Sequence, residues 1–162
     1  DARRACWCGP RLRRRTASSS ERGIRIAWHP LMTPLRALLA LLAATAWISI
    51  NEFVRNQLVL ADHWNAHYAA LGIAFPAEPI NGAVWGLWAL CFAVVILILA
   101  KRFSLFETTA LAWSIGFVLM WLVIGNLGVL PFGIFAVAIP WSMVEAFGAA
   151  WIAKRIAPAA PK

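Results

Sequence analysis

Residues 80–100 read INGAVWGLWALCFAVVILILA, and this stretch decides the fold class because it contains no charged side chain. The hydrocarbon core of a bilayer is about 30 Å thick, and about 20 helical residues are needed to cross it. Asn81-Gly82 opens the stretch, and Lys101-Arg102 closes it at the end of a helix dipole where positive charge is favoured. We therefore predict a transmembrane helix over about residues 80–100.

Three other stretches have the same length and apolar character, namely residues of about 35–55, 105–127 and 131–153. The sequence Gly125-Asn126-Leu127-Gly128 predicts a tight reversal between the last two, which makes them antiparallel neighbours. The chain is therefore predicted to be an all-α integral membrane protein. Its four-transmembrane-helix bundle is expected to occupy residues 32–157, followed by a short tail over 158–162.

The composition agrees with this class. The chain is 62% hydrophobic and 14% charged, with a mean hydropathy of +0.71, whereas soluble domains are about 45–50% apolar and about a quarter charged. The sequence has no G-x-S-x-G, P-loop, CxxCH or dinucleotide-binding motif. The common covalent and cofactor chemistries therefore have no local support, and we predict no cofactor and no catalytic residue.

The basic residues around the predicted spans indicate an orientation. Six of them fall on one side of a four-span bundle, and only Arg55 falls on the other; the six are Arg36, Lys101, Arg102, Lys154, Arg155 and Lys162. Lys and Arg concentrate in cytoplasmic loops. We therefore expect the chain to lie in a bacterial inner membrane with both termini on the cytoplasmic side. Residues 56–79 are expected to form an external loop.

Residues 1–31 differ from the rest of the chain, since eight of the 15 basic residues lie within the first 25 and no hydrophobic periodicity is present. Such a segment cannot bury enough apolar surface to offset its chain entropy, so disorder is expected. One interpretation is non-native sequence upstream of a natural start at Met32. The other is a basic arm that binds anionic lipid head groups. Nucleic acid is not expected as a partner, because no folded reading module accompanies the arm.

The first span leaves a second alternative open. Residues 37–43 followed by Ala44-Thr45-Ala46 resemble a short signal peptide with a cleavage site. The apolar stretch nevertheless continues through Ile50, which gives an anchor of nearly full length. We therefore expect an uncleaved span, although cleavage would leave the orientation of the other three unchanged.

Glu145 is the sharpest candidate for a functional residue. It lies 14 residues after Pro131, which places it about 21 Å along the last span at about 1.5 Å per residue. Ionisable residues inside a membrane are costly, and a carboxyl group there is expected to be neutral unless it is paired. Ser142, one turn earlier, is expected to hydrogen-bond to it. Glu145 is either a protonatable site of a proton-linked transporter or a structural residue that fixes helix register.

A second polar cluster lies at the outer ends of the first three spans. It comprises Asn51, Glu52, Arg55, Asn56, Asn81 and Asn126. Glu52 and Arg55 stand three apart on one helix and are expected to form a local ion pair. The remaining amides either surround the mouth of a polar cavity or serve as ordinary caps.

The stretch DHWNAHY, residues 62–68, is expected to form a short helix on the outer membrane surface. His63 and His67 are four apart and are weak candidates for a metal site. The Glu that zinc peptidases carry beside the first His is absent here, so no metal is predicted.

Helix packing is expected to use pairs of small residues four apart, namely Ala40 and Ala44, Gly82 and Gly86, and Ala146 and Ala150. From these features we predict a small non-enzymatic membrane protein, either a structural or accessory subunit or a protein that binds an apolar ligand. The alternatives are a proton-linked small-molecule transporter that uses Glu145 and, third, a membrane metalloenzyme at the two histidines. Expected partners are membrane lipids and either further copies of the chain or a larger membrane complex.

Overall fold

The computed structural model describes residues 19–158, and this part of the chain is helical with no strand. The chain divides into two units, Asp1–Met32 and Thr33–Lys162. Helix α1 (Ser19–Phe53) begins in the first unit, within the segment of residues 1–31 for which disorder was expected. Residues 1–18 and the tail 159–162 lie outside the described part.

The described residues contain four helices long and apolar enough to cross a membrane, Pro34–Val59, Pro79–Ala100, Leu105–Asn126 and Phe132–Ile156. The prediction of an all-α chain with four helices of the length and apolar character needed to cross a membrane is therefore confirmed. The first span runs a turn beyond the predicted end at Arg55, and the external loop that was expected from residue 56 therefore begins later. This extension is a π-helical segment.

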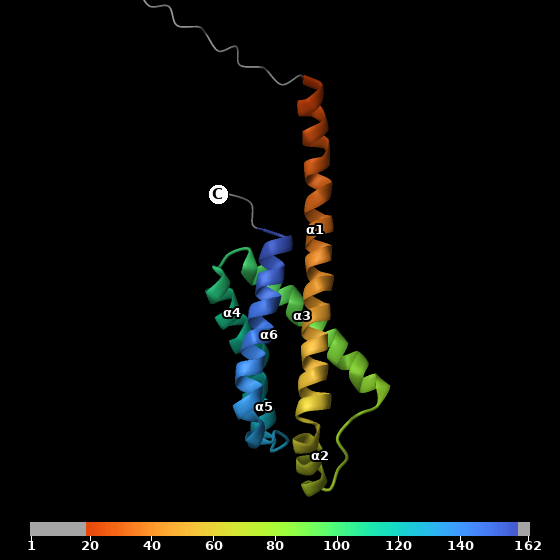
Figure 1. Ribbon diagram of the computed structural model, residues 1–162, viewed down its shortest axis with the longest axis vertical. Helices are drawn as coiled ribbons and strands as arrows, with labels where there is room; N and C mark the ends of the chain where they lie inside the picture. Colours follow the sequence, from red (N-terminus) through yellow and green to blue (C-terminus); the bar gives the residue numbers. More distant parts are fainter. Residues whose placement is uncertain (1–18, 159–162) are drawn as a thin grey trace, which may run out of the picture. The chain divides into compact units, whose positions relative to one another are not determined.

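The elements follow α1 in the order shown in Figure 1. They are η1 (Val54–Val59, π-helix), α2 (Ala61–Ala70), α3 (Pro79–Ala100), α4 (Leu105–Trp113), η2 (Ser114–Val118, π-helix), α5 (Leu119–Asn126), η3 (Phe132–Ile134, 3₁₀-helix) and α6 (Phe135–Ile156). We call the end of the bundle that carries α2 the α2 end. The opposite end, with the α3–α4 turn and the last turn of α6, is the Lys154 end.

Alanines pack the bundle toward the Lys154 end. Seven of them, each at most 6% exposed, belong to one buried cluster that we call the alanine seam: Ala93 and Ala100 of α3, Ala112 of α4, and Ala146, Ala149, Ala150 and Ala153 of α6. Side chains this small let helix backbones approach closely, which is how helices associate where no hydrophobic effect acts between them. The predicted packing through Ala146 and Ala150, and through Ala40 and Ala44 of α1, is confirmed because all four are fully buried.

The predicted packing through Gly82 and Gly86 is wrong. A Cβ atom built on either glycine meets nothing within 4 Å. Figure 1 gives the reason, since α3 crosses the bundle obliquely and its first turns diverge from α5 and α6. A small-residue spacing brings helices together only where their axes converge.

Lys154 fastens the turn between α3 and α4 to α6. Its Nζ donates hydrogen bonds to the carbonyl oxygen of Ala100, the last residue of α3 (2.9 Å), and to that of Phe103 in the turn that follows (2.6 Å). Helix α4 then begins with a capping box in which Ser104 and Glu107 satisfy each other's backbone N–H. The Lys154 end is therefore closed by hydrogen bonds as well as by packing.

Helix α2 packs against the α5–α6 connection at the other end. Leu60 and Trp64 form a second core with Leu130, Ile134 and Ala138. The ring of His67 adds a polar contact, described with the site below. Helix α2 is thus a folded part of the bundle, and it forms one boundary of the site.

Candidate functional site

The candidate site is built around three ionisable residues brought together from α1, η1 and α6. Arg55 donates from Nη1 to Oε2 of Glu145 at 3.0 Å, and from Nη2 to Oε1 of Glu52. The three side chains are only 3%, 6% and 0% exposed for Arg55, Glu52 and Glu145. The predicted Glu52–Arg55 ion pair is confirmed, and it is one half of a buried three-residue cluster.

The charges in this cluster do not balance, because two carboxyl groups share one guanidinium. Glu145 Oε1 is buried and has no hydrogen-bond partner among the described residues. A buried carboxylate oxygen without a donor is costly, whereas a protonated carboxyl group at the same place carries no charge. The arrangement therefore has a place for one proton in addition to the charge of Arg55.

Further groups hold the cluster in place. Asn56 Nδ2 donates to Glu52 Oε2 at 2.8 Å, and the indole Nε1 of Trp64 donates to Asn56 Oδ1 at 3.1 Å. The guanidinium carbon of Arg55 lies 5.2 Å from the centre of the Phe117 ring, within the range of a cation–π interaction. A chain of contacts thus runs from α2 through η1 to the centre of the bundle.

Both π-helical segments lie at this cluster. Arg55 and Asn56 belong to η1, and Phe117, whose ring faces Arg55, belongs to η2. A π-turn inserts one residue into a helix and is found frequently at functional sites. Here the two segments face each other across the same buried charge.

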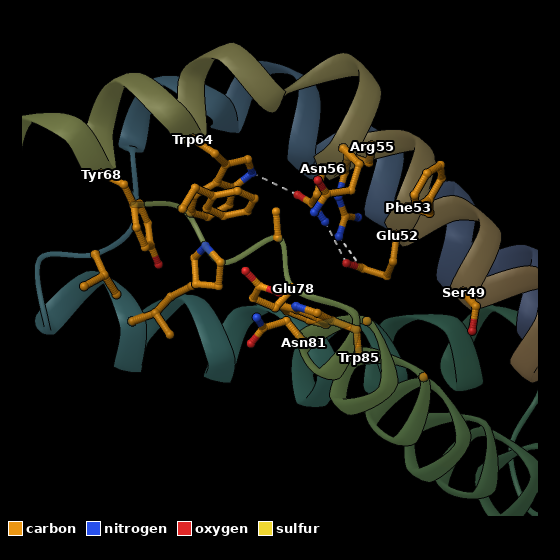
Figure 2. Close-up of a pocket in the computed structure, with 18 of the residues that line it drawn as sticks. Ser49, Glu52, Phe53, Arg55, Asn56, Trp64, Tyr68, Glu78, Asn81 and Trp85 are labelled. Carbon is orange, nitrogen blue, oxygen red and sulfur yellow. Dashed lines mark hydrogen bonds and ion pairs between the residues drawn. The ribbon is translucent and has the colours of Figure 1, made fainter. Parts of the chain in front are cut away.

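A cavity of about 590 Å³ opens beside the cluster, between α1, α2, the start of α3, α5 and α6. Figure 2 shows Glu52, Arg55 and Asn56 at the upper right, Trp64 and Tyr68 at the upper left, and Glu78, Asn81 and Trp85 below them. Gly82 and Gly86 also line the cavity, which explains why a Cβ added to either residue meets no atom within 4 Å. Its volume lies within the range of about 300–1,000 Å³ found for small-molecule sites.

One wall of the cavity is a stack of aromatic rings. The rings of Trp64 and Phe75 are stacked with centroids 5.6 Å apart, and Tyr68 meets both edge-on at 6.2 and 5.2 Å. These rings come from α2 and from the loop that follows it. The segment predicted as an external surface helix therefore contributes Trp64 and Tyr68 to the wall of the cavity.

The amides of the predicted outer cluster separate into three groups. Asn56 and Asn81 line the cavity. Asn51 instead joins helices, since its Nδ2 donates to the Trp47 carbonyl and its Oδ1 accepts from Trp141 Nε1 at 3.2 Å. Asn126, the last residue of α5, is exposed and does not line the cavity.

The expected hydrogen bond between Ser142 and Glu145 is wrong. Ser142 Oγ donates to the carbonyl of Ile139 at 2.9 Å and accepts from Trp113 Nε1 at 2.9 Å. A serine inside a helix commonly donates back to the preceding turn. The carboxyl group of Glu145 turns to Arg55 instead, because a guanidinium offers a charged donor.

The two histidines do not converge. His67 Nε2 donates to the carbonyl oxygen of Gly128 at 3.0 Å, while His63 is exposed. Within the described residues no group of three His, Cys, Asp or Glu side chains is placed to hold a metal ion. The contact of His67 instead ties α2 to the α5–α6 connection.

Comparison with known proteins gives no assignment, since no family model, curated protein or solved structure matches this chain.

Proposed function

We propose that this protein binds one amphipathic small molecule in the cavity beside the Glu52–Arg55–Glu145 cluster. The observation that carries the proposal is the cavity itself, with about 590 Å³ of space and aromatic, apolar and charged walls. Binding sites for small molecules are concave, mostly apolar, and furnished with a few convergent polar groups. Structural or accessory function alone requires no such space next to a buried ion cluster.

The proposed setting is a bacterial inner membrane, with both termini in the cytoplasm and α2 outside. The positive-inside rule supports this orientation. Lys101, Arg102, Lys154 and Arg155 lie at the Lys154 end. At the α2 end, Arg55 is the one Lys or Arg among the described residues, and it is buried in an ion cluster. In this orientation the cavity lies at the external side of the membrane.

The test is to fill the cavity from one wall. Gly86→Leu places a side chain into space where a Cβ meets no atom within 4 Å, so the fold tolerates it. Gly133→Leu is the matched control, because its Cβ is equally free and Gly133 does not line the cavity. Each protein is purified gently from its host membrane. The small molecules bound to it are then extracted and quantified by mass spectrometry.

We expect a single amphipathic species at about one molecule per chain in the wild type and in Gly133→Leu, and its loss in Gly86→Leu. Retention of the same species in Gly86→Leu would show that it binds elsewhere. The absence of any stoichiometric species from the wild type, together with no saturable binding of added amphiphiles, would overturn the proposal.

Proton-linked transport is a second candidate function, favoured by the unpartnered Oε1 of Glu145 beside a shared guanidinium. Under this hypothesis Glu145 carries a proton in the resting protein and exchanges it during each cycle. Infrared spectra of the protein in lipid should show a buried protonated carboxyl band that disappears in Glu145→Gln. An identical spectrum in the variant would remove this candidate.

A further inference from the structure

We propose that the amphiphile bound in this cavity has a positively charged amine as its head group. This inference rests on the ligand-binding function proposed above and adds the chemical class of the ligand. It follows from the charges on the cavity wall, the occupation of the single basic side chain, and the aromatic rings.

Acidic groups outnumber basic groups on the cavity wall. Glu52 and Glu78 line the cavity, and Arg55 is the one Lys or Arg residue among the lining residues. Arg55 is shared with a third carboxyl group, Glu145, directly behind it. Even when Glu145 holds a proton, the lining residues keep one negative charge in excess, so a cation entering the cavity neutralises it.

Arg55 is not free to receive an anionic head group. Both of its terminal nitrogens already donate to carboxylates, and its guanidinium lies against the Phe117 ring. The side chain is only 3% exposed. An anion in the cavity would therefore meet carboxylates without gaining a free positive partner, and its burial there would be unfavourable.

The aromatic wall suits an organic cation. Trp64, Tyr68 and Phe75 form one group of rings, and Trp85 lies on the α3 side of the cavity near Glu78 (Figure 2). Ring faces attract ammonium groups, and aromatic side chains grouped around a carboxylate are a recurrent way to bind them. Glu78 has no ion-pair partner among the described residues, which leaves its carboxylate available.

The rest of the cavity suits the apolar part of the same molecule. Met120, Ile124, Ile134 and Ala138 line it from α5, η3 and α6. Gly82 and Gly86 leave the facing surface of α3 open. The cavity wall thus combines acidic and aromatic groups with aliphatic side chains, which together match an amine that carries a hydrocarbon tail.

The experiment compares three probes with the same ten-carbon tail: decyltrimethylammonium, decanol and decanoate. Binding to the full chain is measured by equilibrium dialysis in nanodiscs of digalactosyl diacylglycerol, a lipid without charge or amine, with empty nanodiscs as the background. The variants are Glu78→Gln, its matched control Asp62→Asn, and Gly86→Leu. Asp62 lies at the same end of the bundle but is exposed and does not line the cavity.

We expect the ammonium probe to bind at least about tenfold more tightly than decanol, with decanoate weakest. Glu78→Gln should remove most of this preference, Asp62→Asn should keep it, and Gly86→Leu should abolish binding of all three probes. Adding phosphatidylethanolamine to the nanodiscs identifies the source of the amine. If phosphatidylethanolamine competes with the ammonium probe, the site is assigned to a membrane lipid. If it does not compete, the site is assigned to a free lipophilic amine.

Two other outcomes separate the inference from the function on which it rests. Equal binding of the three probes, lost in Gly86→Leu, would retain the ligand site and overturn the inferred charge. Tightest binding of decanoate would overturn it as well. Saturable binding of none of the probes would count against both proposals.

Discussion

Replacement of Arg55 by methionine tests whether the three-residue cluster is as buried as the fold implies. Methionine has a similar length and fits an apolar setting, so the main change is the loss of the positive charge. It leaves Glu52 and Glu145, which are 6% and 0% exposed, without their shared partner. It also removes the contact between the guanidinium and Phe117.

The expected loss of unfolding free energy is large. Removal of one partner from a buried ion pair costs about 3–5 kcal/mol, because an uncompensated charge remains. Loss of a desolvated cation–π contact adds up to about 2 kcal/mol. Proton uptake by the two carboxyl groups offsets part of this cost, so we expect about 4 kcal/mol for Arg55→Met. That is a considerable share of the free energy of unfolding of folded proteins, which is generally about 5–15 kcal/mol.

The assay is unfolding by sodium dodecyl sulfate in mixed micelles, followed by circular dichroism. The comparison is a triple variant with Arg55→Met, Glu52→Gln and Glu145→Gln, which removes all three charges and keeps the side-chain volumes close. We expect it to recover at least about 2 kcal/mol relative to the single variant. A single variant within about 1 kcal/mol of the wild type would refute the reasoning, since it would mean that water reaches the cluster.

Three further predictions concern packing and connections. Gly148→Ala should lower the free energy of unfolding by about 1–3 kcal/mol in the same assay, because the added Cβ would lie 2.6 Å from the Trp47 indole. Gly82→Ala, whose Cβ meets no atom within 4 Å, should leave the free energy of unfolding unchanged. Equal losses in the two variants would contradict the predicted packing. Lys154→Met should lower the free energy of unfolding by about 1.5–3 kcal/mol, because two hydrogen bonds from a charged donor are lost. An unchanged free energy of unfolding would contradict the closure of the Lys154 end. His67→Ala should speed hydrogen exchange in α2, while His63→Ala should leave it unchanged; the reverse order would contradict the contact with Gly128.

The four spans were predictable because hydropathy and length are properties of each segment by itself. The burial of Glu145 was predictable for the same reason, from its distance along the last span. Its partner was not, since Arg55 lies 90 residues earlier. Hydropathy does not determine which helices are neighbours or how each is rotated, and the π-turn that carries Arg55 leaves no known signature in the local sequence.

The cavity was the least predictable feature. It depends on the oblique course of α3 and on the loop of residues 71–78 that connects α2 to α3, neither of which can be read from a periodic pattern. The outer polar residues gave a partial signal, since Glu52, Arg55, Asn56 and Asn81 all line it. The aromatic contribution of Trp64 and Tyr68 was missed because DHWNAHY was interpreted as lying on the membrane surface.

The alanine seam has a consequence for the ligand proposed above, because it restricts the routes by which that ligand could leave. Methyl side chains have no rotamers to swing aside, so no side-chain motion can open a passage through residues such as Ala93, Ala146 and Ala150. A route to the Lys154 end therefore requires whole helices to separate, and Lys154 opposes that movement through its two hydrogen bonds. In the ligand-binding function proposed above, this closure favours exchange of the ligand from the α2 side, and vectorial transport would need a second, differently packed state of the helices.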